Sequence, residues 1–265
     1  MKATTTYKKA GESDIWLLGS GKPLVVIHGG PGLDHSYLVD SFSPLGELRK
    51  IIFYNQLGSG QDNELPHDFT VNALVSQFVQ IVQHVGNEES VDVIAHSWGA
   101  YIFYESLKSS HSMNIGRAIL VSPVGLTRNR FDGSGERLIA RIPEDILASV
   151  EAMEANGEGA AVMNMLAPFY FGEPRKDVDL VFTYYNPDTY FKVAESLGEF
   201  DCSDIANYLP RKTSLVYGEC DIELPEDTKE LQDIATLTII PGAGHFSFAE
   251  KPTEFIAVVR QLLTD

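Results

Sequence analysis

Short apolar runs alternate with amphipathic segments through the first half of the chain. The apolar runs stop abruptly at glycine or polar residues, which predicts strands at 23–27, 51–54, 91–95 and 118–121. Apolar side chains at helical spacing fall between them, at 70–85 and 98–109. Strands that alternate with helices predict a parallel sheet joined by right-handed crossovers. Two shorter strands are expected before these, at 4–9 and 13–18.

The strand pattern stops after residue 123 and returns near residue 213. Residues 136–154 and 159–166 suit helices, so we expect a helical insertion across this stretch. Beyond it the pattern predicts strands at 213–217 and 236–240, a helix near 226–233 and a closing helix at 252–263. The sequence therefore predicts an α/β fold with a core formed by 1–123 and 201–265 and a helical cap formed by 124–200.

Composition narrows the choice of partners. The 265 residues are 44% hydrophobic, enough to bury one sizeable core. A formal net charge of -17 repels phosphate backbones and anionic lipids, which argues against nucleic acid and membranes as partners. Cys202 and Cys220 lack metal-ligand spacing and are expected as free thiols, and the start of the chain lacks an apolar signal segment. We expect a cytoplasmic monomer or small homo-oligomer that acts on a small molecule or short peptide.

The apolar run at 91–95 ends at a serine between small residues. A strand that turns into a helix within a few residues pushes the side chain at its tip outward, and small neighbours let the backbone double back. Ala95 and Gly99 flank Ser97 at two residues on either side. The pattern indicates a nucleophilic serine, although serine beside glycine is also common in ordinary turns.

A serine nucleophile needs a base and a third group that orients the base. Asp221 follows the expected strand at 213–217 and His245 follows the one at 236–240. Because the carboxyl ends of parallel strands share one sheet edge, we expect the three residues to converge there. Acidic alternatives to Asp221 are Asp201, Asp204 and Glu223. Four other histidines are expected at surface or helical positions: His35, His67, His84 and His111.

The negative charge of a tetrahedral intermediate needs backbone donors already aimed at it. One is expected from Trp98, the residue after the serine, at the start of the new helix. The other is expected from Gly30 in His28-Gly-Gly-Pro-Gly32, because backbone without a side chain can approach a substrate closely. His28 fits a structural role, and a turn without function is the alternative for this segment.

Five motifs in sequence order resemble those of a known superfamily. They are His28-Gly-Gly-Pro-Gly32, Asn55-Gln-Leu-Gly-Ser-Gly60, Ser97-Trp-Gly99, Gly218-Glu-Cys-Asp221 and Gly244-His245. Together they resemble the α/β-hydrolase fold superfamily, and within it the proline iminopeptidase branch. The resemblance implies a serine hydrolase without cofactor or metal. In it Ser97 attacks a carbonyl carbon, His245 transfers the proton and Asp221 holds the imidazolium, while Gly30 and Trp98 stabilise the oxyanion.

The chain departs from that branch at several positions. Asn55-Gln56-Leu57 stands where Asp-Gln-Arg is usual, and Ala95-His96 replaces a glycine pair. The branch binds a substrate amino group through glutamates, since an ammonium in a dry pocket needs a carboxylate partner. The corresponding positions here fall near Tyr190 and at Ile222. Four glutamates are candidate substitutes, each also explicable as a solvated charge or a cap: Glu195, Glu199, Glu219 and Glu223.

Substrate contacts are expected from residues beside the predicted triad and in the insertion: Gly29, Tyr170, Tyr190 and Phe246. Packing of the insertion on the core is the alternative use of its aromatic residues. The primary prediction is hydrolysis of a carboxylic ester, or of a lactone, thioester or amide, of a small apolar substrate. The alternatives are release of N-terminal proline from peptides, carbon–carbon bond hydrolysis, and a non-catalytic ligand receptor on the same fold.

Overall fold

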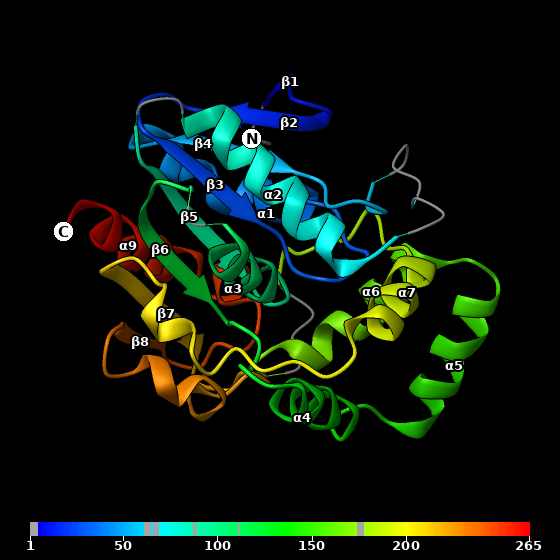
Figure 1. The fold of residues 1–265 in the computed structure, drawn as a ribbon. Coiled ribbons are helices and arrows are strands. Elements are labelled where there is room, and N and C mark those ends of the chain that lie inside the picture. Colours follow the sequence, from blue (N-terminus) through cyan, green and yellow to red (C-terminus); the bar gives the residue numbers. More distant parts are fainter. Residues whose placement is uncertain (1–4, 61–64, 66–68, 87–88, 111, 174–177) are drawn as a thin grey trace.

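The computed structural model describes residues 5–60, 65, 69–86, 89–110, 112–173 and 178–265. Within these ranges eight strands form one sheet in the order β1-β2-β4-β3-β5-β6-β7-β8 (Figure 1). The pairs β1–β2 and β2–β4 are antiparallel, and the remaining pairs are parallel. The strands are β1 (Thr6–Ala10), β2 (Ser13–Leu18), β3 (Pro23–Ile27), β4 (Lys50–Tyr54), β5 (Val91–His96), β6 (Ile115–Val121), β7 (Lys212–Gly218) and β8 (Thr236–Ile240).

The central strands are apolar throughout because both faces of the sheet are covered. Every residue of β3 and β5 is buried. Ala95 near the end of β5 is paired with Ile27 of β3 on one side and with Leu120 of β6 on the other. This register brings the loops that follow β3, β5 and β6 side by side at one edge of the sheet.

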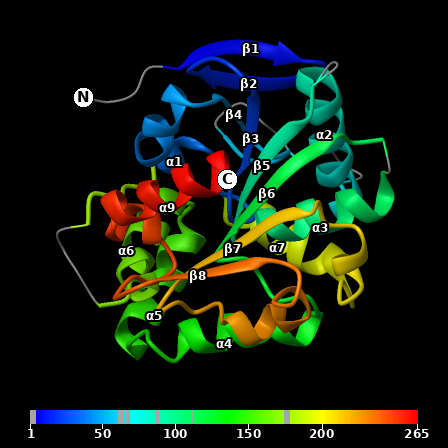
Figure 2. The same ribbon diagram turned by 90° about the vertical axis from the view of Figure 1, so that its left-hand side faces the viewer.

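Helices cover the two faces of the sheet (Figure 2). On one face lie α1 (Ser36–Phe42) and α9 (Pro252–Thr264), and on the other lie α2 (Val71–Gly86) and α3 (Gly99–Ser109). Leu74 and Phe78 of α2 and Phe255 and Val259 of α9 are buried against the sheet. Burying each such side chain contributes about 1.5–3 kcal/mol. Shorter turns, η1 (Ser43–Glu47) and α8 (Ser247–Glu250), adjoin α1 and α9.

Four helices of the described residues lie between β6 and β7 and gather beyond the carboxyl ends of the strands (Figure 1). They are α4 (Arg128–Ile139), α5 (Glu144–Ala155), α6 (Gly159–Tyr170) and α7 (Pro187–Leu197), here called the insertion. Residues 136–154, expected to suit helices, are helical except at 140–143, since α4 ends and α5 begins on either side of Ile142-Pro143. Proline lacks a backbone N–H and disfavours helix in the residue before it.

Two other sequence expectations change in detail. The helix expected near 226–233 is the 3-10 helix η3 (Pro225–Leu231), interrupted at Thr228, whose φ is -125°. The Thr228 hydroxyl lies 2.7 Å from the Tyr217 hydroxyl, which ties this turn into the core. β1 begins at Thr6, and residue 4 of the expected strand lies outside the described residues. A 3-10 turn, η2 (Ile205–Asn207), precedes β7.

The predicted fold class, a mostly parallel sheet flanked by helices, is confirmed. Across the described ranges, each helix is too short or too polar to span a lipid bilayer.

Candidate active site

Ser97 stands at the junction between β5 and α3. Its backbone φ is 53°, a left-handed conformation that residues with a side chain rarely adopt. A Cβ at Gly99 would lie 2.7 Å from the Ile27 carbonyl oxygen and 2.8 Å from that of His28. Only glycine therefore lets α3 start this close to the end of β3. The tight turn places the Ser97 side chain at the edge of the sheet.

His245 lies between Ser97 and Asp221. Its Nε2 is 2.9 Å from Ser97 Oγ, and its Nδ1 is 2.9 Å from Asp221 Oδ1. Asp221 and His245 are only 4% and 3% exposed, so the hydrogen bond between them is shielded from water. A carboxylate that accepts from Nδ1–H leaves the Nε2 lone pair facing the serine hydroxyl. The structure thus brings together the three residues that the sequence placed after β5, β7 and β8.

Hydrogen bonds fix the backbone around His245. Its N–H donates to the Tyr170 carbonyl at 2.9 Å, and its carbonyl lies 3.3 Å from Ser122 Oγ. The preceding N–H, of Gly244, donates to the Glu250 carboxylate at 3.0 Å. Burial raises the pKa of Glu250, and these backbone donors oppose the shift. The ring of His245 therefore stands on a fixed backbone.

Gly30 and Trp98 each present a backbone N–H that donates to no other residue in the described part of the chain. His28 Nδ1 donates to the Gly29 carbonyl at 2.7 Å. Because C=O and N–H point in opposite directions across a trans peptide, this bond turns the Gly30 N–H away from His28. Burial lowers the pKa of His28 to about 3, so its ring is neutral.

Gln56 links the His28–Gly32 segment to the indole of Trp98. Its side-chain Nε2 donates to the His28 carbonyl at 2.7 Å, and its Oε1 accepts the Trp98 indole N–H at 3.1 Å. The Gln56 backbone N–H also donates to His28 Nε2 at 3.1 Å. Gln56 is the middle residue of Asn55-Gln56-Leu57. The chain lacks the charged residues that usually stand on either side of this glutamine, yet the glutamine still makes these hydrogen bonds.

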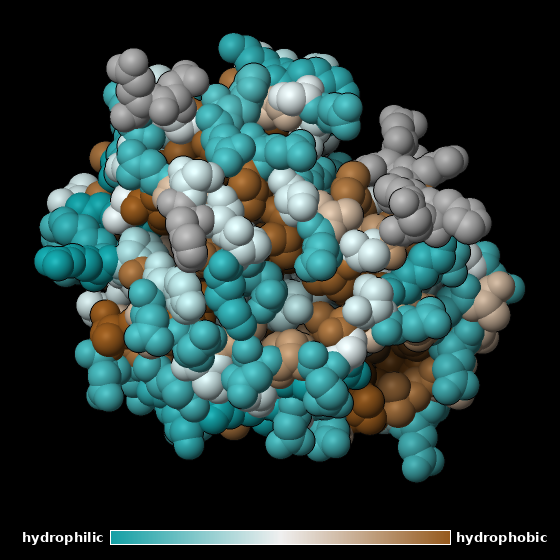
Figure 3. All heavy atoms as spheres, in the orientation of Figure 1, coloured by the Kyte–Doolittle hydropathy of each residue, from teal (hydrophilic) through white to brown (hydrophobic). Residues whose placement is uncertain are grey.

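A cavity of about 200 Å³ opens beside Ser97 and His245. Three predicted substrate residues, Tyr170, Tyr190 and Phe246, lie along it, whereas Gly29 faces Tyr37 and His96 behind it. In the view of Figure 3 an apolar recess is visible between α4 and α5. The full lining is Gly30, Pro31, Leu33, His96, Ser97, Leu138, Glu154, Met163, Leu166, Tyr170, Tyr185, Tyr190, His245 and Phe246.

Glu154 of α5 places a carboxylate in this lining, a position that the sequence pattern does not predict. None of the four glutamates expected to substitute is among the described lining residues. Glu219 instead accepts the Gly242 N–H at 2.8 Å, and Glu223 is buried beside Asp221, to which its backbone N–H donates at 3.1 Å. Burial and the neighbouring Glu151 raise the pKa of Glu154. A charge that faces an apolar cavity needs a partner, and a cationic ligand would supply one.

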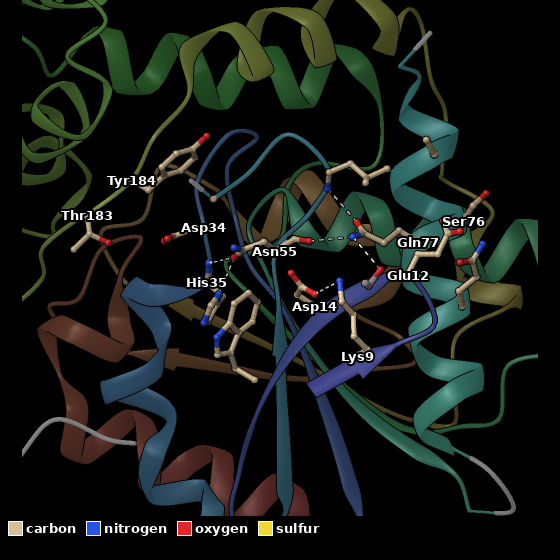
Figure 4. A pocket seen from close by; sticks show the side chains of 16 residues that line it. Lys9, Glu12, Asp14, Asp34, His35, Asn55, Ser76, Gln77, Thr183 and Tyr184 are labelled. Carbon is tan, nitrogen blue, oxygen red and sulfur yellow. Dashed lines mark hydrogen bonds and ion pairs between the residues drawn. The ribbon is translucent and has the colours of Figure 1, made fainter. Parts of the chain in front are cut away.

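A larger cleft, of about 840 Å³, lies between the β1–β2 hairpin, α2 and residues 183–184 (Figure 4). Several of its polar side chains already have partners: Lys9 pairs with Asp14, His35 bonds to Asn55, and Gln77 bonds to the backbone of Asn55 and Leu57. Ser97 is not among its lining residues. We therefore place the candidate site at the smaller cavity.

His35, expected at a surface or helical position, lies at the start of α1 and is buried. His35 is 8% exposed, stacks on Trp16 with ring centroids 4.2 Å apart, and holds Asn55 Oδ1 through Nδ1 at 2.7 Å. His84 lies in α2 as expected, and His67 and His111 lie outside the described residues. Stacking buries the His35 ring although its sequence surroundings are polar.

The side chains that could bind a metal are scattered over the described residues. No group of three or more His, Cys, Asp or Glu side chains among them can hold a metal ion. Cys202 and Cys220 are free thiols. Cys202 is buried with its Sγ 3.1 Å from Glu105 Oε1, and burial raises its pKa far above the ordinary range. Cys202 therefore packs as a protonated thiol.

Known proteins resemble this chain in sequence and in fold. A proline iminopeptidase of Heyndrickxia coagulans is 25% identical over 268 residues, which cover 92% of this chain and 91% of that protein. The crystal structure of the proline iminopeptidase of Mycobacterium smegmatis is similar with a TM-score of 0.67 and 22% identity, covering 98% and 97% of the two chains. The esterase of Exiguobacterium antarcticum is similar with a TM-score of 0.71 and 17% identity over 99% of each chain. A model of the alpha/beta hydrolase family matches residues 24–258. The chain belongs to the alpha/beta hydrolase family.

Proposed function

We propose that the chain is a serine hydrolase that cleaves esters or related acyl compounds of small, largely apolar substrates through an acyl-enzyme. The observation that carries this proposal is the pair of 2.9 Å contacts that His245 makes with Ser97 and with Asp221. A non-catalytic receptor on the same fold has no use for this proton path. The fold's hydrolase membership supports the same reading.

In the proposed reaction Ser97 Oγ attacks the carbonyl carbon while its proton passes to His245 Nε2. Asp221 stabilises the imidazolium that forms, and the N–H groups of Gly30 and Trp98 receive the negative charge on the carbonyl oxygen. The imidazolium then returns the proton to the leaving group as the tetrahedral intermediate collapses. Water enters by the same route and releases the acid from Ser97.

The cavity limits what can bind. Its volume of about 200 Å³ is below the roughly 300–1,000 Å³ of sites for drug-sized ligands, so a small acyl group fits best. Leu33, Met163 and Leu166 make much of the lining apolar. We include in the proposal the division into a core of 1–123 and 201–265 and a cap of 124–200, since residues of the insertion close the cavity over Ser97.

A labelling experiment followed by a substrate panel tests the proposal. A fluorophosphonate probe should label Ser97 in the folded protein, and Ser97→Ala should abolish the labelling. A series of p-nitrophenyl esters should then show faster hydrolysis of short acyl chains than of long ones. Absence of labelling in the folded protein would favour the receptor alternative.

A second candidate is a prolyl aminopeptidase, and Glu154 favours it. The carboxylate lies in the same cavity as Ser97 and can pair with the free amino group of an aminoacyl substrate. Relatives named proline iminopeptidase match over nearly the whole chain. Prolyl-p-nitroanilide and its N-acetylated form separate the two candidates. An aminopeptidase cleaves only the free amine, whereas an acyl esterase shows no such preference.

A further inference from the structure

Tyr37 of α1 and His96 of β5 are buried directly behind Ser97, and the mechanism above gives neither a role. The Gly29 N–H donates to Tyr37 Oη at 2.8 Å, and Tyr37 Oη lies 2.9 Å from His96 Nδ1. His96 Nε2 lies 3.3 Å from the carbonyl oxygen of His245. These bonds form a continuous path from the oxyanion segment to the backbone of the base.

One arrangement of protons satisfies every bond on the path. Tyr37 Oη accepts from Gly29 and could still either donate to His96 Nδ1 or accept from it, whereas the His245 carbonyl oxygen can only accept. The carbonyl therefore decides the tautomer, and His96 Nδ1 is left to accept the Tyr37 proton. The ring proton of His96 is therefore on Nε2, where it donates to the His245 carbonyl. The other tautomer would set the Nε2 lone pair against that carbonyl oxygen. The network thus has a fixed direction.

Both residues stay neutral, so the network keeps this direction. Burial raises the pKa of Tyr37 far above its ordinary value and lowers the pKa of His96 well below its own. For His96 the neighbouring His245 adds to the shift. A neutral imidazole and an intact phenol are the forms that the hydrogen bonds require.

Little free space remains around Gly29, Tyr37 and His96. A Cβ at Gly29 would lie 2.9 Å from His96 Nδ1, 3.0 Å from Tyr37 Oη and 3.2 Å from Ser97 Cβ. The Tyr37 ring packs against Phe182, with ring centroids 5.2 Å apart. The amide of the oxyanion segment, the nucleophile and the network are therefore in contact in one dry cluster.

We propose that Tyr37 and His96 are positioning residues that hold the oxyanion segment and the base in one fixed relation to Ser97. The proposal rests on the proposed function, because it assumes that Gly30 and His245 act on the same intermediate. The path joins Gly29, one residue before the oxyanion donor, to the carbonyl of the residue that carries the base. Without this path of hydrogen bonds, the oxyanion segment and His245 would be positioned by separate loops.

Variants that remove single atoms of the network test this role. Tyr37→Phe keeps the packed ring but removes the link, and His96→Gln keeps an N–H near the Nε2 position but removes the acceptor that Tyr37 uses. Each should lower kcat by about tenfold to 100-fold with little change in KM, as expected when reacting groups shift by a fraction of an ångström to 1 Å. Since both variants break the same bond, the double variant should lose no more than the worse single one.

Tyr104→Phe is the matched control. The Tyr104 hydroxyl is also buried, but it has no hydrogen-bond partner in the described part of the chain. This variant should keep the wild-type kcat. Wild-type kcat in Tyr37→Phe, or losses that multiply in the double variant, would overturn the proposal.

A readout that needs no substrate separates this proposal from the proposed function. If wild-type Ser97 reacts with no fluorophosphonate, the hydrolase assignment fails, and the network is then read by NMR. The proton on His245 Nδ1, shared with Asp221, should give a low-field signal, identified by its loss in His245→Ala. In Tyr37→Phe this signal should shift or broaden while in Tyr104→Phe it stays. An unchanged signal in Tyr37→Phe would show that the network does not position the base.

Discussion

The backbone N–H of His245 donates a 2.9 Å hydrogen bond to the carbonyl of Tyr170, the last residue of α6. The Tyr170 ring also lines the cavity, with its centroid 5.4 Å from that of His245. Glu250 adds a second tie, because its carboxylate accepts the N–H groups of Gly172 and Gly244 at 2.8 and 3.0 Å. The base and the end of this insertion helix are therefore joined through their backbones.

The loop of Asp221 is tied to the insertion as well. Arg137 Nε donates to the Ile222 carbonyl at 2.5 Å, and Arg141 donates to the carbonyls of Cys220 and Asp221 at 3.0 and 3.3 Å. Arg137 is held in place by an ion pair with Asp227. Two of the three candidate catalytic loops thus take support from the insertion: the loop of His245 from the end of α6, and the loop of Asp221 from α4 and the turn after it.

Ser97→Ala should abolish turnover while leaving the protein folded. The substitution removes the attacking oxygen, and loss of a triad nucleophile costs about 10⁶ in kcat in a serine protease. Ester hydrolysis and thermal unfolding should be measured on the same preparation. A variant that keeps more than a few per cent of the activity would rule out Ser97 as the nucleophile.

Asp221→Asn should lower kcat by roughly 10⁴-fold with a similar fold. An amide in this position favours the His245 tautomer with its proton on Nε2, which cannot accept the serine proton. Steady-state kinetics with a p-nitrophenyl ester measure the loss. Asp201→Asn, at an exposed acidic alternative, should keep wild-type activity.

Glu154→Gln should act only on substrates with a free amino group. If the carboxylate pairs with an ammonium, its neutral isostere raises KM for prolyl-p-nitroanilide while leaving simple esters unaffected. The matched control is Glu144→Gln, an exposed glutamate at the start of the same helix. Equal effects of the two substitutions would remove Glu154 from the amine site.

Glu223→Gln should make unfolding less dependent on pH. Burial raises the pKa of Glu223 well above 4.5, with a further contribution from Asp221, so the folded protein holds this proton to a higher pH than the unfolded chain. The associated stability is present at low pH and is lost as pH rises through the folded-state pKa, by about 1.4 kcal/mol per pH unit. Denaturant unfolding from pH 4.5 to 8 should show a smaller fall in the free energy of unfolding for the variant.

The exposed Glu226, in the same segment, supplies the comparison for that measurement. Glu226→Gln should follow the wild-type pH dependence. Parallel curves for wild type and Glu223→Gln would mean that Glu223 does not hold a proton in the folded state.

The positions of Ser97, Asp221 and His245 were predictable because each follows a strand, and strand order fixes where such residues meet. The apolar runs mark the strands, and glycine marks the turns. The same reasoning predicted Gly30 and Trp98, which follow β3 and β5 within a few residues. The local sequence pattern therefore predicts those groups whose positions are determined by the sheet.

Glu154 was not predictable in this way. It shares α5 with Glu144, Asp145 and Glu151, and nothing in the spacing separates the one that faces the cavity from those that face water. Its direction depends on how α5 rests on α6, a packing relation between two insertion helices. The Tyr37–His96 contact joins residues 59 apart in sequence and was equally hidden.

The hydrogen bonds between the insertion and the loops of Asp221 and His245 bear on engineering. Exchanging residues 124–200 for the corresponding segment of another member would import a new binding surface but discard Arg137, Arg141 and the Tyr170 carbonyl. Such a chimaera would gain a new specificity but lose the hydrogen bonds that hold the Asp221 and His245 loops in place. In this chain the insertion thus affects selectivity and turnover together. Directed evolution should therefore change single side chains of the cavity before it exchanges the whole insertion.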